Sequence, residues 1–386
     1  LLCRNRGFAM TVKSRLICDM YKQRQSTLVL AGLILLYVTI GCSDEGKQTA
    51  SPKVRDSISP NHHVSSKSSA FYSARLLEFT VPSFEDVVSL AISDDGKVVA
   101  ASTADLLLHI WTAETGERIH VANPMDMVSE IAFTHAGSRL LLAGSVDEIE
   151  VWSLTPFEKI GEIELNQEGD EVYHYGVQDM TISPDDTKLA FTATGEVVMV
   201  YSLDNYRRLY VKDENDIREG RIQMGFDEDG NHLTIINGHD DHLSFKSVDL
   251  STGGIIRDQR LDSAHLIPLA ISSSGKILVS NVSSGNGVSP MLLEVNGNEP
   301  TRQLPHGITY DVIAGALSAN ADRAFLCVQE GDFHRLVVWN ISENEIEWSS
   351  EAVVDINSGI TTSRDGSSFV TASANQGIAL LWERTR

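Results

Sequence analysis

A ten-residue pattern that recurs seven times from Val87 onward limits most strongly how this chain can fold. The copies are VVSLAISDDG (87–96), VSEIAFTHAG (128–137), VQDMTISPDD (177–186), RIQMGFDEDG (221–230), LIPLAISSSG (266–275), VIAGALSANA (312–321) and NSGITTSRDG (357–366). Successive copies end 41 to 49 residues apart. A repeat of this length indicates an array of similar units, each of which is completed by its neighbours.

The columns of the repeat have a consistent chemistry. The fifth position is always small, the sixth is large and apolar in every copy but the last, and the seventh is Ser, Thr or Asp. We interpret the first six positions as the innermost strand of each unit, where a larger fifth side chain would clash as the units converge. The last three positions are polar and often end in Gly, which predicts a hairpin turn into a second strand.

A third strand is predicted to end near an aromatic residue in five of the seven units. These aromatics are Trp111, Trp152, Tyr201, Trp339 and Trp382, while Val248 and Val295 stand near the equivalent place in units four and five. Over residues 74–386 this pattern resembles the WD-repeat β-propeller family. The resemblance implies an all-β, seven-bladed propeller in which Trp111, Trp152, Trp339 and Trp382 are structural.

One further residue matches the family, and two family features are missing. Asp105, six residues before Trp111, matches the structural Asp of the turn between the second and third strands. No Trp is followed by Asp, and the usual Gly-His pair before the first strand is missing. We therefore expect most blades to lack the hydrogen-bonded network that stiffens well-matched WD repeats.

The last unit lacks a segment for its outer strand, because the sequence stops at Arg386, directly after a predicted third strand. Residues 74–81 (ARLLEFTV) precede the first copy and read as a strand. We predict that this segment completes the last blade and closes the ring. Such closure protects strand edges that would otherwise promote aggregation.

The N-terminal residues 1–41 are expected to be an export signal. From Met20, a candidate for the true start, basic residues precede an apolar run at 28–40 and the pair Gly41-Cys42. This order is typical of a signal peptide, and the run is shorter than the roughly 20 residues of a membrane-spanning helix.

The residues around Cys42 (TIGC) resemble the bacterial lipoprotein signal, although Thr39 stands where Leu is usual. The resemblance implies lipid attachment at Cys42; an ordinary signal or an uncleaved anchor is the alternative. Residues 42–73 are polar and Ser-rich, which predicts a flexible tether. The body at 74–386 is therefore expected in the bacterial cell envelope, outside the cytoplasm and anchored to a membrane.

The charge of the chain excludes one class of partner. Residues 42–386 carry 25 Lys and Arg and 52 Asp and Glu, a net charge of −27. Such a surface repels phosphate backbones, so we expect no nucleic-acid partner. Cys327 lies in an apolar run and is predicted to be a buried small residue.

Motifs for chemistry are scarce. We find no nucleophile elbow, no phosphate-binding glycine loop and no cofactor motif, so we expect no cofactor. His239-Asp240-Asp241-His242 could supply metal ligands. This segment falls in the turn between the second and third strands of blade four, where polar residues are expected in any case, and we predict no metal there.

Partner-binding residues are predicted in the loops that precede three first strands. The segment 166–176 holds two Tyr and one His, and aromatic residues of this kind are common anchors at interfaces. The residues singled out are Tyr173, His174, Tyr175, His265, His306, Tyr310 and Asp311. The alternative is that these loops pack their own aromatics over the blades.

These observations favour a non-catalytic, membrane-tethered scaffold that binds an unknown protein. The alternative is a propeller enzyme, such as a hydrolase or a quinoprotein-like or lactonase-like protein, with its site at the mouth of the channel. An enzyme would need convergent carboxylates, His or a metal near the axis, and no such residue recurs at one offset in several copies.

Overall fold

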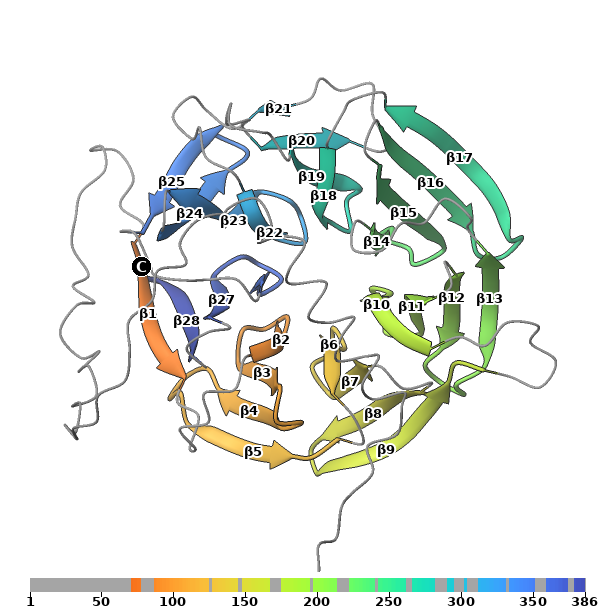
Figure 1. The fold of residues 1–386 in the computed structure, drawn as a ribbon, viewed down its shortest axis with the longest axis horizontal. Coiled ribbons are helices and arrows are strands. Elements are labelled where there is room, and N and C mark those ends of the chain that lie inside the picture. The colour runs from red at the N-terminus through yellow and green to blue at the C-terminus, as the bar shows by residue number, and fades with distance from the viewer. Residues whose placement is uncertain are drawn as a thin grey trace, which may run out of the picture. The chain divides into compact units, whose positions relative to one another are not determined.

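The computed structural model describes residues 71–77, 87–124, 127–144, 148–166, 175–194, 197–213, 222–239, 242–261, 266–281, 290–294, 302–303, 312–330, 333–350, 359–373 and 378–385. All of them belong to one structural unit, Pro60–Arg386, which is distinct from a unit at Leu1–Ser59. The described residues form 28 strands in seven four-stranded antiparallel sheets. The sheets are arranged as blades around a central axis, so the prediction of a seven-bladed propeller is confirmed (Figure 1).

The first four blades each use four strands that are consecutive in the chain. Blade 1 consists of β2 (Val87–Ile92), β3 (Val98–Thr103), β4 (Leu108–Thr112) and β5 (Arg118–Ala122). Blade 2 consists of β6 (Val128–Phe133), β7 (Arg139–Gly144), β8 (Glu148–Leu154) and β9 (Phe157–Glu164). Blade 3 consists of β10 (Tyr175–Ile182), β11 (Lys188–Thr194), β12 (Val197–Ser202) and β13 (Arg208–Asp213). Blade 4 consists of β14 (Ile222–Phe226), β15 (His232–Gly238), β16 (Leu243–Asp249) and β17 (Gly254–Leu261).

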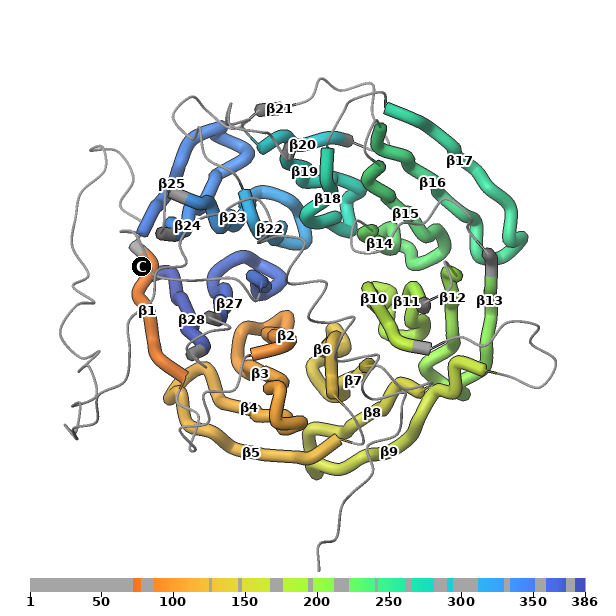
Figure 2. The backbone as a smooth tube through the Cα atoms, in the orientation of Figure 1, coloured from red at the N-terminus to blue at the C-terminus, as the bar shows by residue number. Residues whose placement is uncertain are grey.

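The remaining three blades complete the ring. Blade 5 consists of β18 (Leu266–Ile271), β19 (Lys276–Asn281), β20 (Met291–Glu294) and β21 (Arg302–Gln303). Blade 6 consists of β22 (Val312–Leu317), β23 (Arg323–Glu330), β24 (Phe333–Asn340) and β25 (Glu345–Ser349). Blade 7 consists of β26 (Ile360–Thr362), β27 (Ser368–Ser373), β28 (Ile378–Thr385) and β1 (Phe71–Leu77). Each copy of the repeat provides the innermost strand of its blade, as predicted (Figure 2).

Closure of the ring by an N-terminal strand is confirmed. Strand β1 pairs antiparallel with β28, from Phe71 opposite Thr385 to Leu77 opposite Ala379. The strand begins at Phe71, three residues before the predicted start, and the described part ends at Leu77. The predicted boundary was late because the residues just before 74 read as part of the polar tether.

The seventh and tenth columns of the repeat build the turn after each innermost strand. In all seven blades the side-chain oxygen at position seven accepts the backbone N–H of the residue five or four places later, at 2.9–3.1 Å. The tenth residue has a positive φ of 51° to 74° in every blade. Gly is favoured there because it adopts this left-handed conformation without steric cost. Asp186 and Ala321 are the two exceptions.

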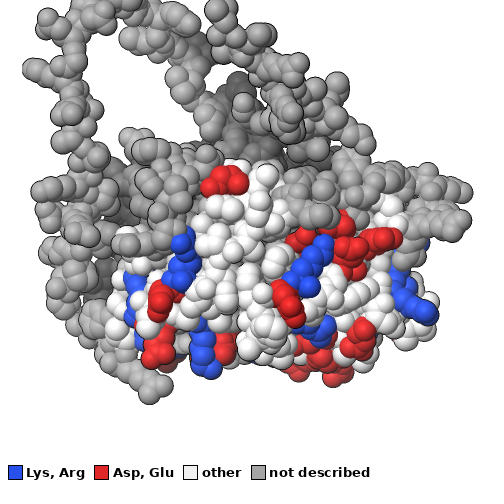
Figure 3. Space-filling view, turned by 90° about the horizontal axis from the view of Figure 1, so that it is seen from below, with Lys and Arg blue, Asp and Glu red and all other residues white. Residues whose placement is uncertain are grey.

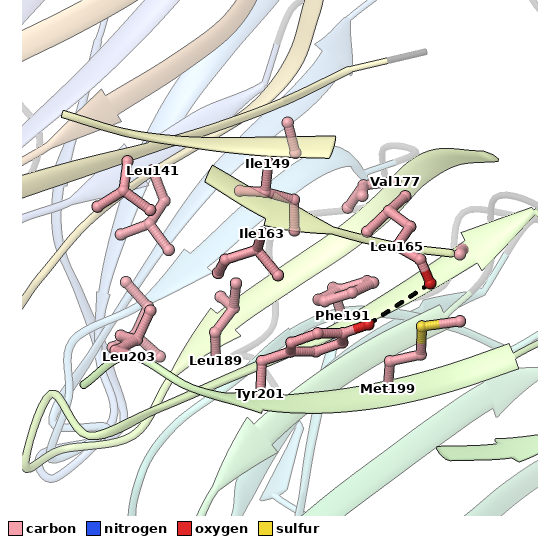
Figure 4. Close-up of a cluster of buried hydrophobic side chains, with 14 of the residues drawn as sticks. Leu141, Ile149, Ile163, Leu165, Val177, Leu189, Phe191, Met199, Tyr201 and Leu203 are labelled. Carbon is pink, nitrogen blue, oxygen red and sulfur yellow. Dashed lines mark hydrogen bonds between the residues drawn. The ribbon is translucent and has the colours of Figure 1, made fainter. Parts of the chain in front are cut away.

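The core is divided into seven hydrophobic clusters, and each lies at the interface between two consecutive blades. Figure 4 shows the cluster between blades 2 and 3, where Leu141 and Ile149 of blade 2 face Phe191 and Tyr201 of blade 3. The hydroxyl of Tyr201 donates to the backbone carbonyls of Glu164 at 3.0 Å and Leu165 at 3.4 Å. The ring is therefore held together by its blade interfaces, because no single core spans the seven blades.

The small fifth column faces the next blade rather than the axis. A Cβ atom built on Gly225 of blade 4 would lie 2.8 Å from Cγ2 of Ile271, which is the sixth residue of the copy in blade 5. Such a distance is shorter than side chains tolerate without movement. The fifth residue of blade 4 is small because the large sixth residue of the next copy packs against it.

The aromatic residues predicted to be structural lie on third strands. Trp111 and Trp339 are fully buried, and Trp382 is nearly so. Trp152 is half-buried and donates from Nε1 to Glu150 at 2.8 Å. Asp105 lies in the turn between β3 and β4, where it accepts the hydroxyl hydrogen of Thr103 at 2.5 Å.

Candidate functional site

Of the residues predicted to bind a partner, the structure describes only Tyr175. Tyr175 is the first residue of β10 and pairs with Thr194 of β11. Tyr173, His174, His265, His306, Tyr310 and Asp311 lie outside the described residues. The described strands fix where these loops attach, because β10, β18 and β22 begin at the same end of the ring.

The opposite end of the ring carries a cluster of charged side chains, which we call the turn cluster: Asp94, His135, Asp186 and Arg364. Each comes from a turn between the first and second strands of its blade. The Nδ1 atom of His135 (blade 2) lies 2.7 Å from Oδ2 of Asp94 (blade 1). The Arg364 guanidinium of blade 7 donates to the same carboxylate oxygen at 3.1 Å. One carboxylate thus joins three blades.

Asp186 extends the cluster to blade 3. Its two carboxylate oxygens accept the backbone N–H groups of His135 at 2.7 Å and Ala136 at 2.8 Å. Asp186 occupies the left-handed tenth position, with φ of 57°, where the other copies mostly have Gly. Asp tolerates this conformation better than most residues. A Gly there would adopt it more easily but would lose both bonds to blade 2.

Backbone contacts continue this line of turns around the ring. The backbone N–H of Arg364 donates to the carbonyl of Asp94, and that of Ala319 in blade 6 donates to the carbonyl of Arg364, both at 3.0 Å. The hydroxyl of Ser273 in blade 5 donates to the carbonyl of Ala319 at 3.1 Å. Hydrogen bonds therefore link the turns of blades 5, 6, 7, 1, 2 and 3 in order.

His135 has an acceptor at each ring nitrogen. Its Nε2 lies 3.2 Å from the backbone carbonyl oxygen of Ile182 in blade 3. Burial opposes the charged form of this half-buried ring, but the hydrogen bond and the charge of Asp94, with help from Ile182 and Asp186, raise the pKa of His135 above its usual value. In the turn cluster the His135 ring and the Arg364 guanidinium thus hold the Asp94 carboxylate, while backbone N–H groups hold that of Asp186.

The turn cluster is not among the sites predicted from the sequence. A signal was available in the eighth column, where Arg364, Asp94 and His135 stand in consecutive blades of the closed ring. Each of them alone is an ordinary turn residue. Only the closure of blade 7 against blade 1 makes Arg364 and Asp94 neighbours.

Asp179 is the second unusual titratable group. It follows irregular pairing between β10 and β11, and its Oδ2 accepts the backbone N–H of Met224 in the innermost strand of blade 4 at 2.9 Å. The surrounding protein desolvates this partly exposed carboxyl and raises its pKa to about 7, although hydrogen bonds from the Met224 and Met180 N–H groups act in the opposite direction. A carboxyl with such a pKa can exchange a proton near neutrality.

The two His residues of the candidate metal segment are stacked on each other. The rings of His239 and His242 lie 4.0 Å apart and nearly parallel, with an angle of 6°. Lone pairs of imidazole nitrogens lie in the ring plane, so two stacked rings do not converge on one ion. Asp240 and Asp241 lie outside the described residues. Within the described ranges, no group of three or more His, Cys, Asp or Glu residues could hold a metal ion.

Charged residues on the rim lie beside partners of opposite sign. On the side seen in Figure 3, acidic and basic side chains are neighbours, with uncharged surface between them. Lys159, for example, lies within 3.0–3.5 Å of carboxylate oxygens of Glu148, Glu150 and Glu162. In the part of the chain that the structure describes, no helix has the length and apolar character needed to cross a membrane.

Comparison with solved structures shows likeness in fold at low sequence identity. A hydrazine synthase chain of Kuenenia stuttgartiensis is similar with a TM-score of 0.62 and 14% identity, covering 79% of this chain and 97% of that one. U3-55K has a TM-score of 0.59 and 11% identity over 80% of this chain and 98% of its own. The WD40 repeats of RRP9 have a TM-score of 0.59 and 11% identity over 81% and 97% of the two chains. This chain resembles the WD40-repeat propellers.

Sequence similarity is limited. Telomerase protein component 1 of Mus musculus is 32% identical to the chain over 99 residues, which cover 22% of this chain and 4% of that protein. The chain therefore spans only a small part of the length of that relative. No family model matches the chain. The structural likeness shows the fold alone, that of a propeller similar to the WD40-repeat propellers, and a function does not follow from the fold.

Proposed function

We propose that this WD40-type propeller is a non-catalytic scaffold that binds a protein partner and is held at a membrane of the bacterial cell envelope by a lipid on Cys42. The observation that carries the scaffold proposal is the turn cluster. Its charged side chains are engaged with one another and with backbone groups across four blades. Such mutual pairing makes a rigid framework, whereas a catalytic constellation directs its groups toward a substrate.

The rigidity of this end favours the opposite end as the binding surface. The segment that contains Tyr173 and His174 precedes β10, which begins at Tyr175, and the segments that contain His265 and His306 precede β18 and β22. Loops on a rigid scaffold commonly carry function, and aromatic side chains are frequent anchors of interfaces. We place Tyr310 and Asp311 on the same surface.

The scaffold proposal is tested by crosslinking and affinity purification from solubilised membranes. One variant replaces residues 167–174 with Gly and Ser, and a matched control replaces the exposed Glu228 and Asp229 at the opposite end with Ser. We expect the loop variant to lose a specific partner that the control retains. Identical partners for both variants would refute the proposed surface.

The lipid anchor needs a separate test. Cys42→Ser is expected to release the protein from the membrane fraction and to remove the mass of the lipid, whereas Ser51→Ala in the predicted tether leaves both unchanged. A Cys42→Ser protein that stays in the membrane fraction would contradict lipid attachment at this residue.

An enzyme is the second candidate, and two observations favour it. One of the similar structures is a hydrazine synthase, so the fold is compatible with catalysis. Asp179 also has a pKa of about 7 at the inner edge of blades 3 and 4. A hydrolase screen with metal analysis separates the two functions: turnover that is lost in Asp179→Asn would establish the enzyme, and its absence in both proteins would favour the scaffold.

A further inference from the structure

The environment of His135 determines its protonation state. Nδ1 faces a carboxylate oxygen of Asp94 at 2.7 Å, and Nε2 faces the carbonyl oxygen of Ile182 at 3.2 Å. Neither oxygen can donate a hydrogen bond, so each contact requires a hydrogen on the ring nitrogen. A neutral imidazole carries only one such hydrogen. It could donate to Asp94 of blade 1 or to the carbonyl of Ile182 in blade 3, but not to both.

Three other charged groups face His135, each from a different blade. Asp94 of blade 1 favours the imidazolium through a hydrogen bond and through its charge, and Asp186 of blade 3 favours it through its charge alone. Arg364 of blade 7 lies 3.4 Å from Nδ1 and shares the Asp94 carboxylate. A neutral Nδ1 would be an acceptor, and Arg364 is already within reach to donate to it.

We propose that His135 is a pH-dependent link between blades: as an imidazolium it joins blade 2 to blades 1 and 3, and when it loses its proton Arg364 takes over the Asp94 carboxylate and one of these links is released. The switch needs no movement of the backbone, because both cations already contact the same carboxylate. It acts within the turn cluster, at the end of the ring opposite the predicted partner loops, and it does not require that those loops bind a partner.

The direction of the pH effect follows from the sign of the pKa change. A folded-state pKa above the unfolded value means that the folded state binds the proton more tightly. The stabilisation by His135 is then fully present below about pH 6.5, the usual pKa of His. It is lost as pH rises through the raised pKa of the folded protein.

Urea unfolding of the full chain at pH 6.5 and pH 9 tests the proposal with the variants His135→Gln and Lys97→Gln. Lys97 is the control, because its Nζ also pairs with an aspartate in a turn, Asp95 at 2.8 Å, but its pKa is raised above an ordinary value that already lies above pH 9. We expect the unfolding constant of the wild-type protein to be larger at pH 9 than at pH 6.5. His135→Gln should reduce the ratio of the two constants, and Lys97→Gln should leave it unchanged.

Titration of the wild-type protein by NMR keeps the proposal testable if His135→Gln does not fold. The His135 ring signal, assigned by labelling and its contact with Asp94, should titrate with a midpoint above 6.5. A midpoint at or below 6.5, or a pH ratio in His135→Gln equal to that of the wild type, would overturn the proposal.

Discussion

The interface between blades 6 and 7 differs in chemistry from the interface between blades 4 and 5. Aromatic rings dominate the first: Tyr72, Phe325, Trp348, Phe369 and Trp382. The second contains a single aromatic residue, Phe245, among aliphatic side chains. A Gly in the innermost strand of blade 4 lets the two blades approach there. The two interfaces thus reach close packing by different means.

The difference reflects how the two parts of the chain are brought together. Blades 4 and 5 are consecutive in the chain, whereas β1 reaches blade 7 from the other end of the propeller sequence. Tyr72 of β1 donates its hydroxyl hydrogen to the carbonyl of Gly366, 294 residues away, at 3.3 Å. Closing so long a loop costs more conformational entropy than joining neighbours. Large aromatic surfaces offset that cost, because each ring buries more area than an aliphatic side chain.

A buried ionic group adds to the 6/7 interface. The Glu347 side chain of β25 is 4% exposed. Its carboxylate oxygens lie 2.9 Å from Nε of Arg323 and 2.6 Å from Nη2 of Arg384 in β28. Burial, together with the charge of Glu347, raises the pKa of Tyr72, so its phenol stays neutral and keeps the hydrogen to donate. Strand β1 also stabilises the other side of blade 7, where Leu77 packs into the cluster shared with blade 1.

Deletion of residues 71–77 is the strongest test of this comparison. It removes the buried side chains of Tyr72 and Leu77 and exposes the edge of β28. We expect the free energy of unfolding to fall by at least about 5 kcal/mol, because each large buried side chain accounts for 2–5 kcal/mol. Urea denaturation measures this loss. Deletion of residues 43–49 is the control and should change nothing; equal stability of the two deletions would refute closure by β1.

The same substitution at both interfaces compares them directly. Phe369→Ala removes a ring that lies 5.0–6.4 Å from the rings of Tyr72, Phe325, Trp348 and Trp382. Phe245→Ala removes a ring from aliphatic surroundings. We expect the free energy of unfolding to fall by about 5 kcal/mol in Phe369→Ala and by about 3 kcal/mol in Phe245→Ala, because aromatic pairs add to the energy of burial. Equal losses in urea denaturation would show that the aromatic pairs contribute nothing beyond buried area.

Gly225→Ala tests the close approach at the 4/5 interface. The new Cβ would meet Cγ2 of Ile271 at 2.8 Å, so we expect a loss of about 2 kcal/mol from overpacking. Ile271→Ala removes the three side-chain atoms that the new Cβ would meet at 2.8–3.2 Å, and it should relieve the strain in the double variant. A double-mutant cycle measures this coupling. Additive losses would mean that Gly225 is required for its backbone rather than for the space beside Ile271.

The sequence was sufficient for the parts of the fold that each copy builds by itself. The innermost strands and the turns follow from residues that are close in the chain, such as Ser93 and the N–H of Val98. Contacts between copies could not be read in this way. Tyr72 stands beside polar tether residues, and its aromatic neighbours become evident only when blade 7 is complete. The same limitation hid the turn cluster, since Asp94 and Arg364 are 270 residues apart.

The turn residues with positive φ give the smallest expected effect and compare a turn of blade 6 with a turn of blade 4. Ala321 of blade 6 has φ of 51°, whereas Gly230 of blade 4 has φ of 63° in the same column. Ala321→Gly relieves a left-handed alanine and should stabilise the protein by about 1 kcal/mol, while Gly230→Ala should destabilise it by about 1 kcal/mol or more. The destabilisation by Gly230→Ala should exceed the stabilisation by Ala321→Gly in magnitude, because a Cβ on Gly230 would also lie 3.2 Å from Cβ of Ser183 in blade 3. Thermal unfolding of the two variants measures whether each change raises or lowers the stability. A destabilised Ala321→Gly would show that the buried Ala321 methyl contributes more packing energy than the backbone strain costs.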